Sequence, residues 1–249
     1  MRSALRGIRR AQRSARLAVW RLTTTTRLRA RGCRAQISIG RLVDYESLPA
    51  LKTRGAGNGS VVITIGDKVE LGSYLILDIH LGRTSTLSIG SGSMFEHADR
   101  LQLWGGVMEI GEGAEIRDDA LLKASSNDAK LRLGRQVRIG KGTAVHCHES
   151  VELGDRVTLA ERVTVVDTFH DVDGSDEWTM NQPIGIGPVR IESNVLVHSG
   201  AVVVHGTTLG RNAVVAANAL VGTGSYPPGV VLLGNPARAV RKLAKAEDG

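Results

Sequence analysis

The sequence is poor in aromatic residues and cysteine, and it contains no long hydrophobic run. Three Trp, three Tyr and two Phe stand among 249 residues, against 30 Gly. The two cysteines, Cys33 and Cys147, match neither a disulfide framework nor a zinc spacing, so a reduced, cytoplasmic compartment is expected. No apolar stretch is long enough to span a bilayer, and none follows the basic N-terminus as a secretory signal requires.

Acidic residues are absent from residues 1–34, which carry 11 Arg. The rest of the chain holds 21 Lys and Arg against 25 Asp and Glu, so the basic excess lies in this arm. On a helical wheel, apolar residues gather on one side: Leu5, Ile8, Ala11, Ala15, Val19 and Leu22. Arginines take the other side: Arg2, Arg6, Arg9, Arg10, Arg13 and Arg16. This pattern predicts a basic amphipathic helix that ends at the β-branched run Thr23–Thr26.

Three roles fit such a helix. Residues 1–22 can lie on an anionic membrane surface, with Trp20 near the interface and the protein peripheral to the inner face. The helix can instead pack on the N-terminal end of the folded domain as a cap. Binding to a polyanion is the third role, but nucleic acid is disfavoured because aromatic interleaving and a recognisable binding module are both missing.

The main positive signal is a six-residue repeat in which an aliphatic residue opens each unit and a small residue often follows. The openers recur in threes: Ile110, Ile116, Leu122; Leu133, Ile139, Val145; Leu153, Leu159, Val165; Ile191, Val197, Val203; Leu209, Val215, Val221. Three short strands make one coil of a triangular prism, and stacked coils pair as parallel strands. No segment within 60–235 keeps a 3.6-residue period, which excludes helices there. A glycine-rich β-sandwich remains the alternative.

The repeat divides the chain. Residues 1–34 form the basic arm, 35–60 are expected to be an irregular linker, 61–235 the β-helix, and 236–249 a tail. The largest interruption predicts an extruded loop over 168–188. His170 is the sixth residue of the last hexapeptide before this loop, which puts it at a prism corner. A histidine there is either a general base, for which its pKa near neutrality suits it, or an ordinary loop residue.

The coils, the loop after His170, and the ending that contains Gly234-Asn235-Pro236-Ala237-Arg238 resemble the hexapeptide-repeat acyltransferases. The most similar branch contains the galactoside, maltose and nodulation-factor acetyltransferases and those of capsule and exopolysaccharide biosynthesis. The resemblance implies an all-β, left-handed parallel β-helix and a homotrimer with sites between subunits. It also implies acetyl-CoA as donor, no metal, and a saccharide acceptor in polysaccharide biosynthesis.

The resemblance also assigns residues. His170 matches the catalytic histidine, which takes a proton from the acceptor hydroxyl as that group attacks the thioester. His146 and Asp171 would contact the acceptor. The matching CoA positions are Ser199, Ala217, Gly222, Thr223, Arg238 and Arg241. This chain departs from the family at three places: His146 often has Asn as its counterpart, Thr223 a basic residue, and His198 usually Gly.

Two other functions stay open. A catalytically silent scaffold or regulatory subunit is one, because fold alone does not guarantee activity and the departures at Thr223 and His198 favour loss of it. A γ-class carbonic-anhydrase-like metal enzyme is the other, suggested by His146, His148, His170, His198 and His205. Their spacing does not reproduce the ligand pattern of that class, and the long loop is typical of the acyltransferases.

Overall fold

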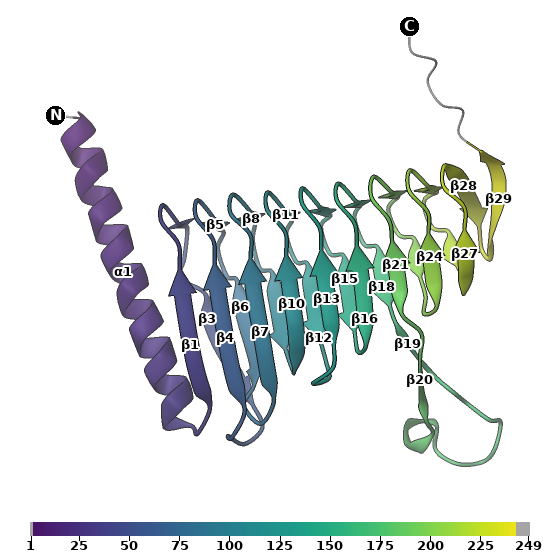
Figure 1. Cartoon of the computed structure of the whole chain (residues 1–249), viewed down its shortest axis with the longest axis horizontal. Helices are drawn as coiled ribbons and strands as arrows, with labels where there is room; N and C mark the ends of the chain where they lie inside the picture. The colour runs from purple at the N-terminus through teal and green to yellow at the C-terminus, as the bar shows by residue number, and fades with distance from the viewer. Residues whose placement is uncertain (1, 243–249) are drawn as a thin grey trace, which may run out of the picture.

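The computed structural model describes the backbone of residues 2–242 and the side chains from residue 12 onward. Helix α1 (Arg2–Ala30) lies across one end of a solenoid of stacked coils, and a narrow ribbon leaves the wall far from that helix (Figure 1). The solenoid wall consists of three parallel sheets. The predicted left-handed parallel β-helix, with its N-terminal helix and extruded loop, is confirmed.

The first sheet contains β1 (Arg34–Ile39), β4 (Ser60–Ile65), β7 (Thr84–Ile89), β10 (Gly106–Ile110), β13 (Lys130–Leu133), β16 (Ser150–Leu153), β21 (Val189–Ile191), β24 (Thr207–Leu209) and β27 (Gly224–Tyr226). The second contains β2 (Asp44–Tyr45), β5 (Glu70–Leu71), β8 (Met94–Phe95), β11 (Glu115–Ile116), β14 (Arg138–Ile139), β17 (Thr158–Leu159), β22 (Leu196–Val197), β25 (Val214–Val215), β28 (Val230–Gly234) and β29 (Ala237–Lys242). The third contains β3 (Ala50–Arg54), β6 (Ile76–His80), β9 (Arg100–Leu103), β12 (Leu121–Ala124), β15 (Ala144–Cys147), β18 (Thr164–Val166), β23 (Val202–Val203) and β26 (Leu220–Val221).

The repeat openers form the core. In the second sheet, Ile139 pairs with Leu159, which pairs with Val197 and then Val215, and all four side chains are buried. The small glycine after an opener is needed because coils approach closely at the corners. A Cβ added at Gly134 would lie 2.6 Å from the backbone nitrogen of Asp155 in the next coil. Backbone proximity thus explains the residue that follows many openers.

The expected irregular linker at 35–60 is wrong, because this segment forms the first coil. β1 pairs with β4 in parallel from Arg34 opposite Ser60 to Ile39 opposite Ile65. Ala35 and Ile37 alternate inward as the pleat requires. Ile39, Tyr45 and Leu51 keep the six-residue spacing, but Tyr45 is aromatic and charged residues follow it and Leu51, so the segment escapes a search for aliphatic openers followed by small residues. The two-residue alternation inside β1 is a second signal that marks it.

Helix α1 packs on this first coil. Leu17, Trp20, Thr24 and Leu28 are buried, and the Trp20 indole N–H donates to the Pro49 carbonyl at 2.8 Å. The helix therefore has the cap role, and Trp20 lies inside the protein instead of at a membrane interface. The buried side of α1 is not the apolar side that the helical wheel predicts. The described members of that predicted side, Ala15, Val19 and Leu22, are exposed on the opposite face of the helix.

The predicted helix end at the threonine run is also wrong. The Thr23 and Thr25 hydroxyls donate to the carbonyls of Val19 and Arg21 one turn back, so they stay compatible with helical backbone. Burial of Leu28 against the first coil outweighs the low helix propensity of the threonines, and α1 continues to Ala30. Within residues 2–242, no helix is both long and apolar enough to cross a membrane.

One buried carboxyl in the wall lacks a full set of partners. Asp99 is fully buried, its Oδ1 accepts the Ala120 N–H at 2.9 Å, and its Oδ2 has no hydrogen-bond partner among the described residues. Burial raises the pKa of Asp99 to about 8, and the nearby carboxylates of Asp118, Glu96 and Asp119 raise it further. The neutral acid is thus the form that this site accommodates.

Replacing Trp20 by Ala should lower the free energy of unfolding by about 3 kcal/mol, because the change removes buried surface and leaves the Pro49 carbonyl unpaired. Urea unfolding followed by circular dichroism measures the effect. Val19→Ala, on the exposed side of the same turn, is the matched control and should change stability by less than about 0.5 kcal/mol. Equal effects from both variants would contradict the cap role.

Asp99→Asn should stabilise the protein increasingly as pH rises from about 4 to about 8. Because the folded state holds the Asp99 proton up to about pH 8 and the unfolded chain loses it near pH 4, the wild type loses stability as pH rises through this window. The neutral amide removes that loss, so the variant should exceed the wild type by about 2–5 kcal/mol at pH 8.5 and match it at about pH 3.5. Urea unfolding at both pH values, with the exposed Asp176→Asn as control, measures the difference.

Candidate functional site

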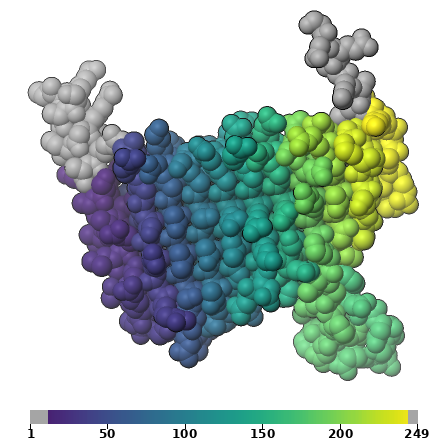
Figure 2. All heavy atoms as spheres, in the orientation of Figure 1, coloured from purple at the N-terminus to yellow at the C-terminus, as the bar shows by residue number. Residues whose placement is uncertain are grey.

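The predicted loop leaves the wall between β18 and β21 and returns as an antiparallel ribbon. β19 (Thr168–His170) pairs with β20 (Ile184–Ile186), and a short 3-10 helix, η1 (Thr179–Asn181), lies beyond them. The space-filling view shows the excursion as a green lobe that projects from the body (Figure 2). The solenoid continues across the excursion, since β16 pairs directly with β21.

A buried aspartate fixes the point of departure. Asp167 is fully buried, and its carboxylate accepts the backbone N–H groups of His148, Glu149 and Ser150 at 2.8–3.0 Å. Its own carbonyl accepts the Gly187 N–H at 2.8 Å, which joins the two ends of the excursion. Hydrogen bonds to an ionised acceptor are stronger than neutral ones, so Asp167 anchors the root of the ribbon firmly.

An aromatic stack fixes the first turn of the ribbon. The Phe169 ring stacks on the His205 ring with centroids 4.0 Å apart and planes 25° from parallel. Gly185 stands opposite Phe169 in the ribbon, and a side chain there would collide with the Phe169 ring. The Thr223 hydroxyl donates to the His205 carbonyl at 2.8 Å. Contacts thus run from Thr223 through His205 to the residue beside His170.

His170 itself is exposed and lies three residues beyond the corner. The chain leaves the prism at Asp167, so the expected placement of His170 on the corner is corrected to the end of β19, opposite Ile184. The reason is that Thr168 and Phe169 already pair within the ribbon. Its carbonyl accepts the Val172 N–H at 3.1 Å, and its ring has no hydrogen bond to any residue that the structure describes. The neighbouring Asp171 is exposed too, and its N–H donates to the Pro183 carbonyl at 2.9 Å.

His146 lies on the third sheet beside the departing strand. It pairs with Val166 on one side and with Lys123 on the other, and its ring is partly exposed. Burial lowers the pKa of His146, and the charge of Lys123 lowers it further. The ring is therefore neutral at pH 7 and can both donate and accept a hydrogen bond. A contact between His146 or Asp171 and an acceptor stays a prediction.

The six positions assigned to CoA fall on two prism edges and one end strand. Gly222 and Thr223 follow β26 at the edge that carries Asp167 and His205. Ser199 and Ala217 stand at the opposite edge of the third sheet, where the Asn218 N–H donates to the Ser199 carbonyl at 3.0 Å. The Ser199 hydroxyl donates to Glu161 at 2.6 Å. The structure thus places four of the positions along the two borders of one sheet.

The remaining positions of interest lie apart. Arg238 and Arg241 are exposed on β29, which pairs antiparallel with β28 at the end of the second sheet. His198 is exposed one residue beyond β22. Cys147 is a buried wall residue, as predicted, and burial raises the pKa of its thiol to about 12. In the described part of the chain, no three His, Cys, Asp or Glu side chains form a group that could hold a metal ion.

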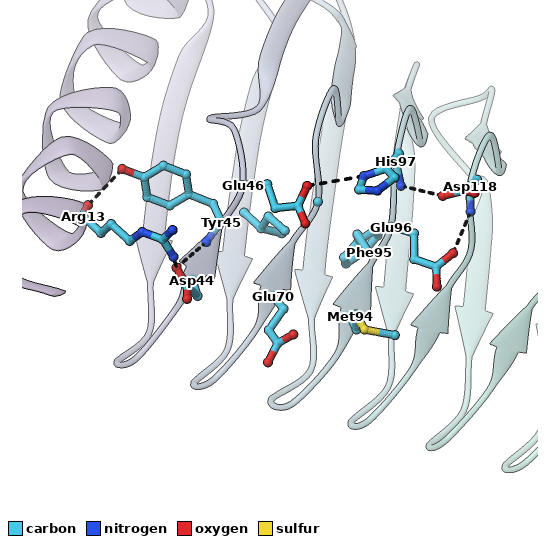
Figure 3. A pocket seen from close by; sticks show the side chains of 12 residues that line it. Arg13, Asp44, Tyr45, Glu46, Glu70, Met94, Phe95, Glu96, His97 and Asp118 are labelled. Atoms are coloured by element: carbon cyan, nitrogen blue, oxygen red, sulfur yellow. Dashed lines mark hydrogen bonds and ion pairs between the residues drawn. The ribbon is translucent and has the colours of Figure 1, made fainter. Parts of the chain in front are cut away.

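A separate hollow of about 610 Å³ lies near the helix end of the solenoid (Figure 3). Its walls are rich in carboxylates: Asp44, Glu46, Glu70, Glu96 and Asp118. Several of these are engaged within the chain, since Asp44 pairs with Arg13 and Glu46 lies 3.5 Å from His97. The negative charge makes this hollow unsuited to the phosphates of CoA, and it contains none of the residues predicted for the site.

Sequence reasoning missed Asp167, Phe169 and His205 as site-forming residues. Asp167 lies two residues after Val165, the last opener before the excursion. An acidic residue at this place is the available signal, because a chain that leaves a β-helix exposes backbone amides that need an acceptor. The stack of Phe169 on His205 joins residues 36 positions apart by sequence number. This contact can be found only when the strand alignment between neighbouring coils is known.

Comparisons with known proteins give one family match. Residues 188–223 match the family model described as bacterial transferase hexapeptide (six repeats). A curated relative, the 2,3,4,5-tetrahydropyridine-2,6-dicarboxylate N-acetyltransferase of Staphylococcus aureus, is 37% identical over 67 residues. That stretch is 27% of this chain and 28% of the relative, so the chain matches little more than a quarter of the length of such relatives.

Solved structures are similar to this chain at low identity. The polySia-specific acetyltransferase NeuO aligns with a TM-score of 0.43 and 17% identity, over 87% of this chain and 84% of NeuO. AntD, an N-acyltransferase from Bacillus cereus in complex with dTDP and 3-hydroxybutyryl-CoA, aligns with a TM-score of 0.43 and 16% identity, over 89% of each chain.

Asp167→Asn should destabilise the root of the ribbon, because the amide –NH₂ replaces one acceptor oxygen and faces backbone donors. We expect the free energy of unfolding to fall by about 2–4 kcal/mol and proteolysis at Trp178 to become faster. Urea unfolding and limited chymotrypsin digestion measure the two effects. Asp171→Asn is the matched control, since its side chain is exposed four residues away. Indistinguishable variants would remove Asp167 from its anchoring role.

Proposed function

We propose that the chain, whose residues 188–223 match the model of the bacterial transferase hexapeptide family, is an acyl-CoA-dependent O-acyltransferase of that family. The acyl group is most simply acetyl, as in the curated N-acetyltransferase relative, and the acceptor a hydroxyl of a saccharide or glycan precursor. The proposed assembly is a homotrimer in which neighbouring chains complete each site.

One observation carries the proposal: a continuous set of contacts links the expected CoA edge to the expected base. Thr223 bonds to His205, His205 stacks on Phe169, and Phe169 adjoins His170 in β19. A residue that acts on a substrate at this edge must be held at a defined distance from it, and a rigid stack supplies that distance.

In the proposed reaction, His170 acts as the general base. Its neutral ring accepts the proton of the acceptor hydroxyl while the hydroxyl oxygen attacks the thioester carbonyl carbon. The C–S bond then breaks, and the CoA thiolate takes the proton from the imidazolium as it leaves. No enzyme nucleophile is needed, which agrees with a Cys147 thiol that is buried and not ionised near neutral pH.

The wall near the third sheet suits the pantetheine arm. A Cβ added at Gly222 would meet no atom within 4 Å, so the backbone there is open to a ligand. Ala217 is small and exposed at the other border. Arg238 and Arg241 supply exposed guanidinium groups for phosphates, which guanidinium binds by paired hydrogen bonds. His146, neutral and half-buried, and the exposed Asp171 are the proposed acceptor contacts.

His170→Ala should reduce turnover by about 100-fold or more, because it removes the group that accepts the hydroxyl proton. Free-thiol release from acetyl-CoA, measured against a panel of sugars, glycosides and amino sugars, gives the rate. His97→Ala, an exposed histidine in the acidic hollow, is the control and should keep wild-type turnover. Turnover retained in His170→Ala would eliminate it as the base.

Calorimetry with CoA on the same samples separates the remaining outcomes. CoA binding without turnover on any acceptor would show that the panel lacks the right acceptor. The absence of both binding and turnover would contradict the enzyme and favour a silent scaffold. Amine-dependent release would change the proposal to N-acylation.

A further inference from the structure

Helix α1 carries two apolar rows on opposite sides. The inner row, Leu17, Trp20, Thr24 and Leu28, is buried on the first coil. The outer row contains Ala15, Val19 and Leu22, and here Val19 is 60% and Leu22 67% exposed. The cap role accounts for the first row and leaves the second without a partner in this chain.

The sequence continues the spacing of the outer row. In the sequence it continues toward the N-terminus at positions 5, 8 and 11 with Leu, Ile and Ala, at the three- and four-residue spacing of one helical row. The backbone of α1 is helical over this whole stretch. The sequence pattern is thus more regular than scattered surface residues would give.

The charge around this row is of one sign. Residues 1–34 contain 11 Arg and neither Asp nor Glu. Arg16, Arg21 and Arg27 are exposed, and none of them forms an ion pair with a residue that the structure describes. An exposed apolar row on a helix that also carries exposed guanidinium groups without such partners matches a surface that offers both hydrocarbon and negative charge.

We propose that the outer row of α1 docks on an anionic lipid bilayer. The helix lies across the end of the solenoid, with the wall entirely on one side of it, so the opposite side can approach a flat surface without obstruction (Figure 1). A nucleic acid would use the arginines but would leave Val19 and Leu22 in water. An anionic membrane would contact both the arginines and the apolar residues. This docking is independent of the proposed reaction.

The test is flotation of the full-length protein with vesicles of phosphatidylcholine containing about 30 mol% phosphatidylserine. Wild type should float with these vesicles and stay behind with pure phosphatidylcholine. The double variant Val19→Asp/Leu22→Asp should bind the anionic vesicles at least about tenfold more weakly, because it places carboxylates in the apolar row. Deleting residues 1–34 is unsuitable, because it would uncover the first coil.

The matched control is Leu233→Asp/Val240→Asp, which changes two comparably exposed residues (52% and 54%) at the other end of the solenoid. It adds the same charge and should float as wild type does. Circular dichroism and the unfolding midpoint should be unchanged in both double variants. Flotation that is equal in all three proteins, or absent in wild type, would overturn the proposal. Binding of wild type to heparin that Val19→Asp/Leu22→Asp retains, without flotation, would assign the arm to polyanions instead.

Discussion

Each coil of this protein completes its backbone hydrogen bonds and its apolar core only through the coils on either side. The parallel pairing of short strands, two to six residues long, would be marginal in isolation, and stability comes from their repetition in register. The same dependence makes the two ends special, since a terminal coil has a neighbour on one side only. The chain solves the problem with α1 at one end, through Leu28 and Trp20, and with the antiparallel strand β29 at the other.

The excursion obeys the same constraint. A wall built by register cannot absorb some twenty extra residues, so they leave at a single corner while the strands before and after them pair as though nothing intervened. The departing chain would leave backbone amides of the preceding corner unpaired, and the Asp167 carboxylate fills that place. The residue that completes the hydrogen bonds of the wall thus also determines where the ribbon with His170, the proposed base, begins.

Most of the solenoid could be predicted from the sequence because its openers repeat every six residues and point inward without exception from Ile110 to Val221. The first coil could not, since the aromatic Tyr45 replaces an aliphatic opener and charged residues follow Tyr45 and Leu51. The extent of α1 depended on tertiary burial of Leu28, which no local propensity reveals. At the site, His170 and the break were visible as an interruption of a pattern. The stack of Phe169 on His205 and the hydrogen bonds to Asp167 depend on which residues become neighbours in successive coils. Finding them requires the strand register of the whole solenoid.

Because the coils are regularly spaced, the number of coils between two features gives the distance between them along the solenoid. Five steps in the first sheet separate β1 from β16, the strand of the coil that releases the ribbon. At about 4.8 Å per step, the ribbon begins roughly 24 Å from the first coil, and α1 adds about 10 Å beyond it. A protein resting on the outer side of α1 would therefore hold His170 on the order of 30 Å above that plane. If the proposed reaction and the proposed docking both hold, His170 at such a height would pass over a sugar attached directly to a lipid and meet one at the far end of an oligosaccharide. The number of coils would set the minimum chain length of a surface-bound acceptor.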